Sequence, residues 1–145
     1  MTAGAASAAE TTAATTGVLV VAYTPRPDGR AALHRAVEEA RLRGLRLVVV
    51  NASRGDALVD PGFAPPEDVA EVRTWLESTG VTYEFRQLPS GAEPADRVVE
   101  AAAELDAELI VIGMRRRSPV GKLLLGSTAQ RVLLDAACPV LAVKP

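Results

Sequence analysis

The sequence predicts an α/β fold in which a parallel β-sheet carries helices on both faces. From Gly17 onward, short aliphatic runs alternate with longer segments of helical period, and this alternation is typical of successive βαβ units. Hydrophobic residues make up 48% of the 145 residues and aromatic residues only 3%, so aliphatic side chains must form the core, as they do where helices pack on a sheet. The length corresponds to about one domain.

The first part of the chain is expected to form two strands joined by a helix. Val18–Ala22 is predicted to be the first strand. A helix capped by Asp28 follows it and ends at Gly44, a residue that favours helix termination. Leu45–Val50 is predicted to be the second strand, and its unbroken apolar run indicates that both of its faces are covered.

A loop, a helix and a third strand are expected next. The stretch from Ala52 to Pro66 carries several Gly and Pro residues and little periodicity, which predicts a long surface loop. Helical spacing resumes from Glu67 to Ser78, and Gly80 ends it. Val81–Leu88 alternates apolar and polar residues, so this third strand should have one wetter face and lie toward a sheet edge.

The last part of the chain completes the alternation. Its predicted elements are a helix beginning at Pro94, a strand from Leu109 to Ile112 that ends at Gly113, a loop from Met114 to Leu125, a helix from Ser127 to about Ala136 and a strand from Pro139 to Val143. Strands and helices in strict alternation fit a doubly wound sheet. Such sheets bind ligands outside the carboxyl ends of the strands, where the strand order reverses.

Residues 1–16 differ in composition from the rest of the chain. They are rich in Ala and Thr and lack the basic residues and leucine-rich centre of a secretion signal. We expect a disordered tail there and a folded domain over residues 17–145.

The charge and the cysteine count exclude several classes of function. The net charge is −2, from 16 Lys and Arg against 18 Asp and Glu. This balance argues against a dedicated nucleic-acid binder, because such proteins depend on an excess of basic residues to neutralise phosphates. With only one cysteine, Cys138, the chain can form no intramolecular disulfide, which favours a reducing compartment. With only one histidine, His34, it has too few Cys and His residues to hold a zinc ion. No apolar stretch approaches the roughly 20 residues of a membrane span. We therefore expect a soluble cytoplasmic protein with neither nucleic acid nor membrane as a partner.

Positive charge is concentrated in one stretch of the chain. From Leu109 to Leu134 there is no Asp or Glu. The basic residues of this stretch are Arg115, Arg116, Arg117, Lys122 and Arg131. The stretch leads from the end of a strand to the start of a helix, where unpaired amides and the helix dipole favour an anion.

Small and hydroxylated residues accompany these charges. Gly113 and Gly126 would allow close approach of the backbone, and Ser127 and Thr128 would add hydroxyl donors. Two interpretations remain open. The stretch binds a phosphate, or Ser127 and Gln130 form a capping box while the arginines form a solvated face or contact an acidic partner.

Other catalytic and phosphate-binding motifs are missing from the sequence. Gly121 and Lys122 lack the first glycine and the Ser or Thr of a P-loop. The first strand is followed by no dinucleotide-binding glycines, and no Gly-x-Ser-x-Gly motif is present. His34 is expected on a helix surface and Cys138 as an inert core thiol. No enzyme activity is expected.

The segment Gly113 to Thr128, with the following helix and Cys138–Val143, resembles the universal stress protein family, and the resemblance extends from about Gly17 to Lys144. The family signature is a glycine, two residues, a second glycine, nine residues, and a third glycine followed by Ser or Thr. Arg116 stands at the second glycine. The other positions match at Gly113, Gly126 and Ser127.

The resemblance implies an adenine nucleotide alpha hydrolase-like fold, with a five-stranded parallel sheet of order 3-2-1-4-5 and helices on both faces. It also implies a homodimer formed through the fifth strand, Pro139–Val143, and, for one subgroup of the family, ATP binding. We therefore expect a site for ATP or another adenine nucleotide, with or without Mg²⁺.

The resemblance also implies which residues form this site. ATP-binding members carry an acidic residue at the end of the first strand, where this chain has Tyr23 and Thr24; Thr24 can donate to a ribose or a base. Val50 and Asn51 would border the base through backbone contacts, and Arg115 and Arg116 would supply charge. The expected binding residues are Thr24, Val50, Asn51, Gly113, Arg115, Arg116, Gly126, Ser127 and Thr128.

The functional hypothesis is a stress-response adaptor with a modest-affinity site for an adenine nucleotide or another phosphorylated anion. The alternative is a nucleotide-free dimeric interaction protein whose arginine-rich loop engages an acidic partner. A third hypothesis, an enzyme of the wider nucleotide alpha hydrolase group, lacks a visible catalytic grouping.

Overall fold

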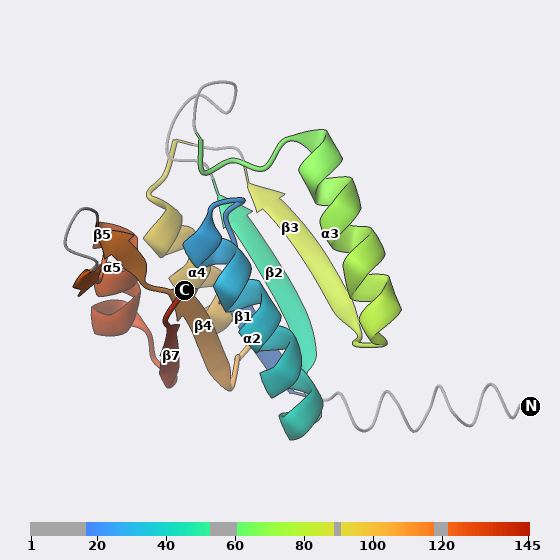
Figure 1. Ribbon diagram of the computed structural model, residues 1–145. Coiled ribbons are helices and arrows are strands. Elements are labelled where there is room, and N and C mark those ends of the chain that lie inside the picture. The colour runs from blue at the N-terminus through green and yellow to red at the C-terminus, as the bar shows by residue number, and fades with distance from the viewer. Residues whose placement is uncertain (1–16, 53–60, 89–90, 118–121) are drawn as a thin grey trace, which may run out of the picture.

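A parallel sheet of five strands runs through the centre of the molecule (Figure 1). The computed structural model describes residues 17–52, 61–88, 91–117 and 122–145; the expected tail, 1–16, lies outside them. In sheet order the strands are β3 (Tyr83–Leu88), β2 (Arg46–Ala52), β1 (Val18–Ala22), β4 (Leu109–Gly113) and β7 (Val140–Val143). Because β7 is the fifth strand of this sheet, the predicted order 3-2-1-4-5 is confirmed.

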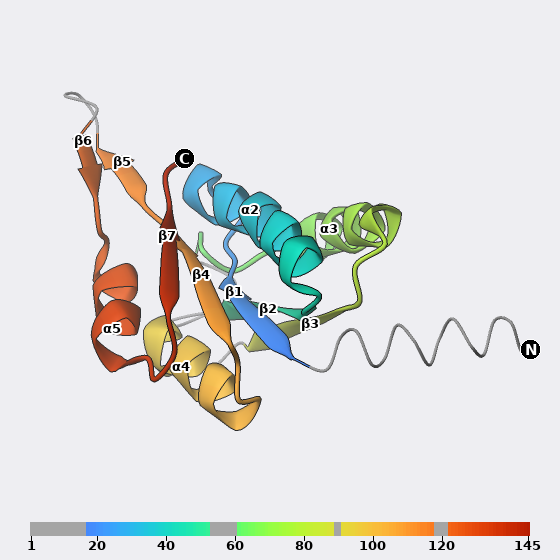
Figure 2. The ribbon, with the colours of Figure 1, turned by 90° about the horizontal axis from the view of Figure 1, so that it is seen from below.

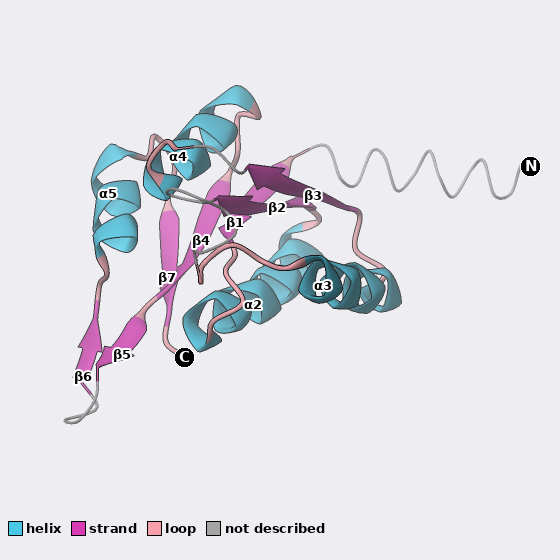
Figure 3. Ribbon diagram, turned by 90° about the horizontal axis from the view of Figure 1, so that it is seen from above, coloured by secondary structure: helices cyan, strands magenta, loops and turns pink. Residues whose placement is uncertain are grey.

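Helices cover both faces of the sheet (Figure 3). The helices are α2 (Pro27–Arg43), α3 (Pro66–Thr79), α4 (Pro94–Glu104) and α5 (Ser127–Asp135). One apolar core joins the sheet to α2 and α3, and a second joins its other face to α4 and α5. The central strands β1, β2 and β4 are buried almost throughout, as their unbroken aliphatic runs predict. Among the described residues, no helix combines the length and apolar character that a membrane span requires.

The predicted loop from Met114 to Leu125 is partly wrong, because its described ends form a hairpin. β5 (Arg115–Arg117) pairs antiparallel with β6 (Lys122–Leu124), and the hairpin lies beyond the end of β4, away from the main sheet (Figure 2). Each strand has only three residues and neither alternates apolar with polar residues. The hydrogen bonds between them therefore leave no periodic signal in the sequence.

Gly44 and Gly80 end α2 and α3 as predicted, but the N-cap predicted for α2 is wrong and the capping box considered for α5 does not form. Arg26, and not Asp28, is the N-cap of α2, and Pro27 occupies the first helical position, where its fixed φ favours helix initiation. Gly126 is the N-cap of α5, with no side-chain cap, so Ser127 lies inside the helix. Gln130 donates instead to the Leu125 carbonyl at 3.0 Å, and no capping box forms.

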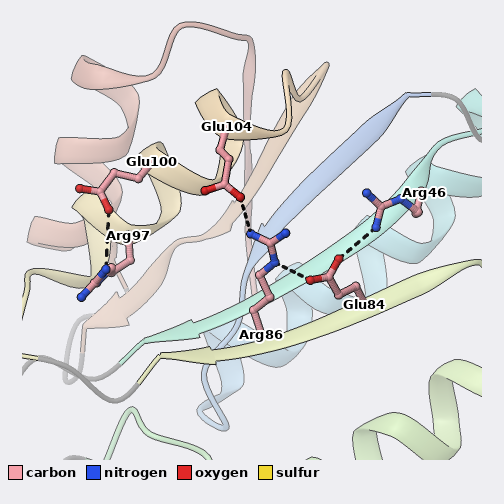
Figure 4. A network of polar contacts seen from close by, with 6 residues as sticks. All are labelled: Arg46, Glu84, Arg86, Arg97, Glu100 and Glu104. Atoms are coloured by element: carbon pink, nitrogen blue, oxygen red, sulfur yellow. Dashed lines mark hydrogen bonds and ion pairs between the residues drawn. The ribbon is translucent and has the colours of Figure 1, made fainter.

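The edge strand β3 carries the polar face that its alternation predicts (Figure 4). Arg86 Nε lies 2.5 Å from Glu84 Oε2 on the same strand, and Arg86 Nη1 lies 3.3 Å from Glu104 Oε1 on α4. Arg46 Nη1 of β2 contacts Glu84 at 3.2 Å. Hydrogen bonding from Arg86 lowers the pKa of Glu84 below its usual value. Because these side chains are partly exposed, each pair contributes at most about 1 kcal/mol.

Candidate functional site

A cavity of about 210 Å³ lies at the carboxyl ends of the strands. It opens between β1 and β4, where the strand order reverses, which is where doubly wound sheets bind ligands. Its wall combines the ends of β1, β2 and β4 with the beginnings of α2, α4 and α5 and with Arg115 of the hairpin. Seven of the expected binding residues share this wall: Thr24, Val50, Gly113, Arg115, Gly126, Ser127 and Thr128.

Gly113 is required by packing between two elements of the fold. A Cβ built on Gly113 would overlap the backbone carbonyl of Asp28, at the start of α2. In the same way, a Cβ on Gly29 would overlap the backbone and Oγ1 of Thr24. Because neither glycine has a Cβ, the first turn of α2 packs closely against the ends of β4 and β1. Gly113 therefore has a structural role in addition to the one expected for it in ligand binding.

Thr24 lines the cavity, and its hydroxyl group is buried. Its Oγ1 atom is shielded from solvent and has no hydrogen-bond partner among the described residues. A buried hydroxyl without a partner costs about 1–3 kcal/mol, and such groups in native structures call for an explanation. The Oγ1 atom lies against Gly29 at the start of α2.

Asn51 shapes the cavity without lining it. Its fully buried amide donates to the carbonyls of Tyr23, at 2.9 Å, and Gly62, at 2.7 Å, and its Oδ1 accepts from the Ala64 amide at 2.9 Å and from Gln87 at 3.0 Å. These bonds hold residues 62–64, in the last part of the predicted loop, against the ends of β1 and β3. Asn51 is thus a positioning residue, and its neighbour Val50 forms the wall.

The N-terminus of α5 lies at the cavity wall. The first amides of a helix have no acceptor within it, and α5 has neither a side-chain cap nor an acidic residue in its first turn. Ser127 and Thr128 line the cavity at this point. A Cβ on Gly126 would meet nothing closer than Arg115 Cδ, at 3.7 Å. This end of the cavity has the donors and the dipole that suit an anion.

The described part of the predicted cationic stretch is less positive than the sequence indicates. Arg131 does not line the cavity and pairs with Asp96 of α4 at 2.9 Å. Arg115 Nε lies 4.0 Å from Asp28 Oδ2. The side chains of Arg116, Arg117 and Lys122 lie outside the description, although the backbone of Arg116 belongs to β5.

Asp28 is a cavity residue that sequence reasoning missed. Its apparent role as a helix cap concealed it. The signal that could have identified it is its place in the first turn of the helix after β1, since these turns face the ligand site in doubly wound sheets.

The end of β1 is fixed by a buried polar cluster. Tyr23 is 1% exposed, and its hydroxyl donates to Asp68 Oδ2 of α3 at 2.6 Å. Arg30 of α2 contacts Asp68 Oδ1, also at 2.6 Å. Burial, followed by the hydrogen bond to Asp68, raises the pKa of Tyr23 well above its ordinary value. The cluster positions Tyr23, and with it the adjoining Thr24, from both helices on that face.

The remaining reactive side chains lie away from the cavity. His34 is exposed on α2, as expected, and packs against Trp75 in a tilted arrangement with ring centroids 4.3 Å apart. Cys138 is a free, half-buried thiol whose pKa is raised by burial. Within the described ranges, no group of three or more His, Cys, Asp or Glu side chains could hold a metal ion.

The fold and the cavity together define a doubly wound α/β protein with a ligand cleft at the reversal of strand order. The model of the universal stress protein family matches residues 16–144. The chain belongs to this family.

Relatives and solved structures agree with this assignment. A universal stress protein of Mycolicibacterium smegmatis is 50% identical over 128 residues, which cover 88% of this chain and 98% of that protein. The structure of the universal stress protein from Archaeoglobus fulgidus in complex with dAMP is similar with a TM-score of 0.62 and 32% identity, covering 88% and 97% of the two chains. A universal stress protein in complex with cAMP is similar with a TM-score of 0.68 and 27% identity, covering 88% and 96%.

Proposed function

We propose that this protein binds an adenine nucleotide or a similar phosphorylated anion in the cavity between β1 and β4 and acts as a stress-response adaptor. The observation that carries the proposal is one cavity at the reversal of strand order that is lined both by Thr24 and by the N-terminus of α5, a helix with neither a side-chain cap nor an acidic residue in its first turn. The similar structures that hold dAMP and cAMP support an adenine nucleotide as the ligand.

Each end of the cavity would contact a different part of the nucleotide. The α5 amides with Ser127 and Thr128 would bind the phosphate, and Arg115 would add charge-assisted hydrogen bonds. The nucleoside would lie toward the ends of β1 and β2, with Thr24 bonded to it and Val50 in apolar contact. Arg116, which follows Arg115 in β5, would contribute further positive charge.

An adaptor role fits these residues better than catalysis. None of the described side chains that line the cavity is a histidine, and its one carboxylate, Asp28, lies beside Arg115. The cavity would therefore bind a nucleotide without supplying an evident base for activating water. ATP would bring Mg²⁺ on its phosphates. We place this role in the cytoplasm, because the one cysteine of the sequence is suited to a reducing compartment.

Calorimetric titration of the purified protein with AMP, ADP, ATP and cAMP tests the proposal. We expect saturable binding of at least one of them, and Arg115→Gln should weaken AMP binding by about tenfold, because a hydrogen bond to a charged group is lost. Arg131→Gln is the matched control, since Arg131 pairs with Asp96 outside the cavity. The absence of heat with all four nucleotides would contradict the proposal and favour the nucleotide-free interaction protein.

A homodimer through β7 is part of the same proposal. β7 is hydrogen-bonded to β4 on one side, and its side chains are aliphatic and half-buried in the single chain. An exposed aliphatic edge strand promotes pairing with another strand. Sedimentation equilibrium at micromolar concentration should give twice the mass of one chain, and a monomer under those conditions would refute the dimer.

A further inference from the structure

We propose that Asp28 is a specificity-determining residue whose carboxylate, beside the Arg115 guanidinium group, repels the phosphate charge of the ligand and so favours nucleotides with one phosphate over those with three. This inference rests on the proposed nucleotide binding. Asp28 is the one acidic residue among the described residues that line the cavity. Arg26 and Arg115 are the basic residues of the same described wall.

The position of Asp28 is set by the backbone. The residue lies in the first turn of α2, and its carbonyl group occupies the space that a Cβ on Gly113 would need. The Asp28 backbone is therefore held at the end of β4 by close packing. Its side chain is only 19% exposed, so solvent and salt screen its charge less than that of a surface carboxylate.

Arg115 connects this carboxylate to the anion-binding end of the cavity. Its Nε atom lies 4.0 Å from Asp28 Oδ2. On the other side, its Cδ and Nε atoms lie 3.7 and 3.9 Å from the position that a Cβ on Gly126 would take. The side chain thus passes directly beside the N-cap of α5, where the phosphate is expected. A phosphate bound there and the carboxylate of Asp28 would share one guanidinium group.

The contact between Asp28 and Arg115 leaves Arg115 able to bind a phosphate. A separation of 4.0 Å is longer than a hydrogen bond, so the contact is electrostatic, and a guanidinium group carries five N–H donors. The same geometry places the carboxylate close to the bound phosphate. Each added phosphate charge is then repelled by Asp28, which disfavours a triphosphate more than a monophosphate.

Neutralising Asp28 should therefore change the selectivity of the site. We expect Asp28→Asn to raise ATP affinity about tenfold more than AMP affinity, on the basis of Coulomb repulsion between close, partly screened charges. Adenosine, which carries no phosphate, should bind the variant and the wild type equally. Calorimetric titrations with adenosine, AMP and ATP in EDTA measure these ratios without a metal ion on the phosphates.

A matched control separates this effect from a general change in charge. Asp96→Asn also removes a carboxylate paired with an arginine, but Asp96 pairs with Arg131 and does not line the cavity, so its ATP to AMP ratio should equal that of the wild type. Asp28→Ser repeats the test with a residue favoured near helix N-termini, in case the asparagine variant is unstable.

Three results would overturn the inference. If the wild type binds neither AMP nor ATP, the proposed nucleotide site itself fails. If the wild type binds them but Asp28→Asn and Asp28→Ser leave the ATP to AMP ratio unchanged, the site stands and the role of Asp28 is wrong. If both variants lose adenosine affinity, Asp28 contacts the nucleoside and does not oppose the phosphates.

Discussion

Replacing Gly113 by alanine is expected to lower the free energy of unfolding by about 3 kcal/mol, the upper part of the range for overpacking a tight contact. The added methyl group would overlap the carbonyl oxygen and carbonyl carbon of Asp28. Both atoms belong to the backbone, so no side chain can rotate away, and the first turn of α2 must separate from the end of β4. Urea unfolding followed by circular dichroism measures the change.

The control for Gly113→Ala is Gly91→Ala. A Cβ on Gly91 would have nothing within 4 Å, and its φ lies outside the positive region. The free energy of unfolding of the Gly91→Ala variant should stay within about 0.5 kcal/mol of the wild-type value. Equal stability of the two variants would show that the end of β4 and the start of α2 do not pack as closely as described.

Replacing Asp68 by alanine is expected to lower the free energy of unfolding by about 2–3 kcal/mol, because a buried hydroxyl loses its acceptor and a cation its partner. Asp68 is 7% exposed and joins Tyr23 of β1 to Arg30 of α2. We place the loss below that for a fully buried ion pair, because the Arg30 side chain is 48% exposed. Thermal and urea unfolding measure it.

Two further variants define what Asp68 contributes. Tyr23→Phe removes one hydroxyl and leaves the contact between Asp68 and Arg30, so its loss should be smaller, about 1 kcal/mol. Glu104→Gln removes one member of the partly exposed network on β3 and α4 and should change stability by less than about 1 kcal/mol. If Asp68→Ala were no more damaging than Glu104→Gln, the buried cluster would not be what fixes the end of β1.

The order of elements could be predicted from the sequence because each central strand is an unbroken aliphatic run. Val18–Ala22 and Leu109–Gly113 lie within the sheet and are buried, so their residue types follow directly from their surroundings. The hairpin of β5 and β6 could not be predicted in this way. Its pairing depends on hydrogen bonds between two short segments. The run of basic residues in β5 is equally compatible with a loop, so it does not indicate a strand.

The candidate site was predictable to a lesser degree. Thr24 and Ser127 follow from the rule that ligands bind at the carboxyl ends of strands, together with the family signature. The cavity position of Asp28 and the pairing of Arg131 with Asp96 depend on contacts between α2 and β4 and between α4 and α5. Such contacts join residues far apart in the chain, and no local pattern reports them.

The two margins of the sheet have opposite chemistry, and this difference limits how the protein could assemble. β3 carries Glu84 and Arg86 in an ionic network, whereas β7 is aliphatic along its whole length, Val140–Val143. Charged margins discourage strand addition. If two copies join through β7 about a twofold axis, both of their outer margins are β3, and an assembly built in this way stops at two chains instead of growing into a filament.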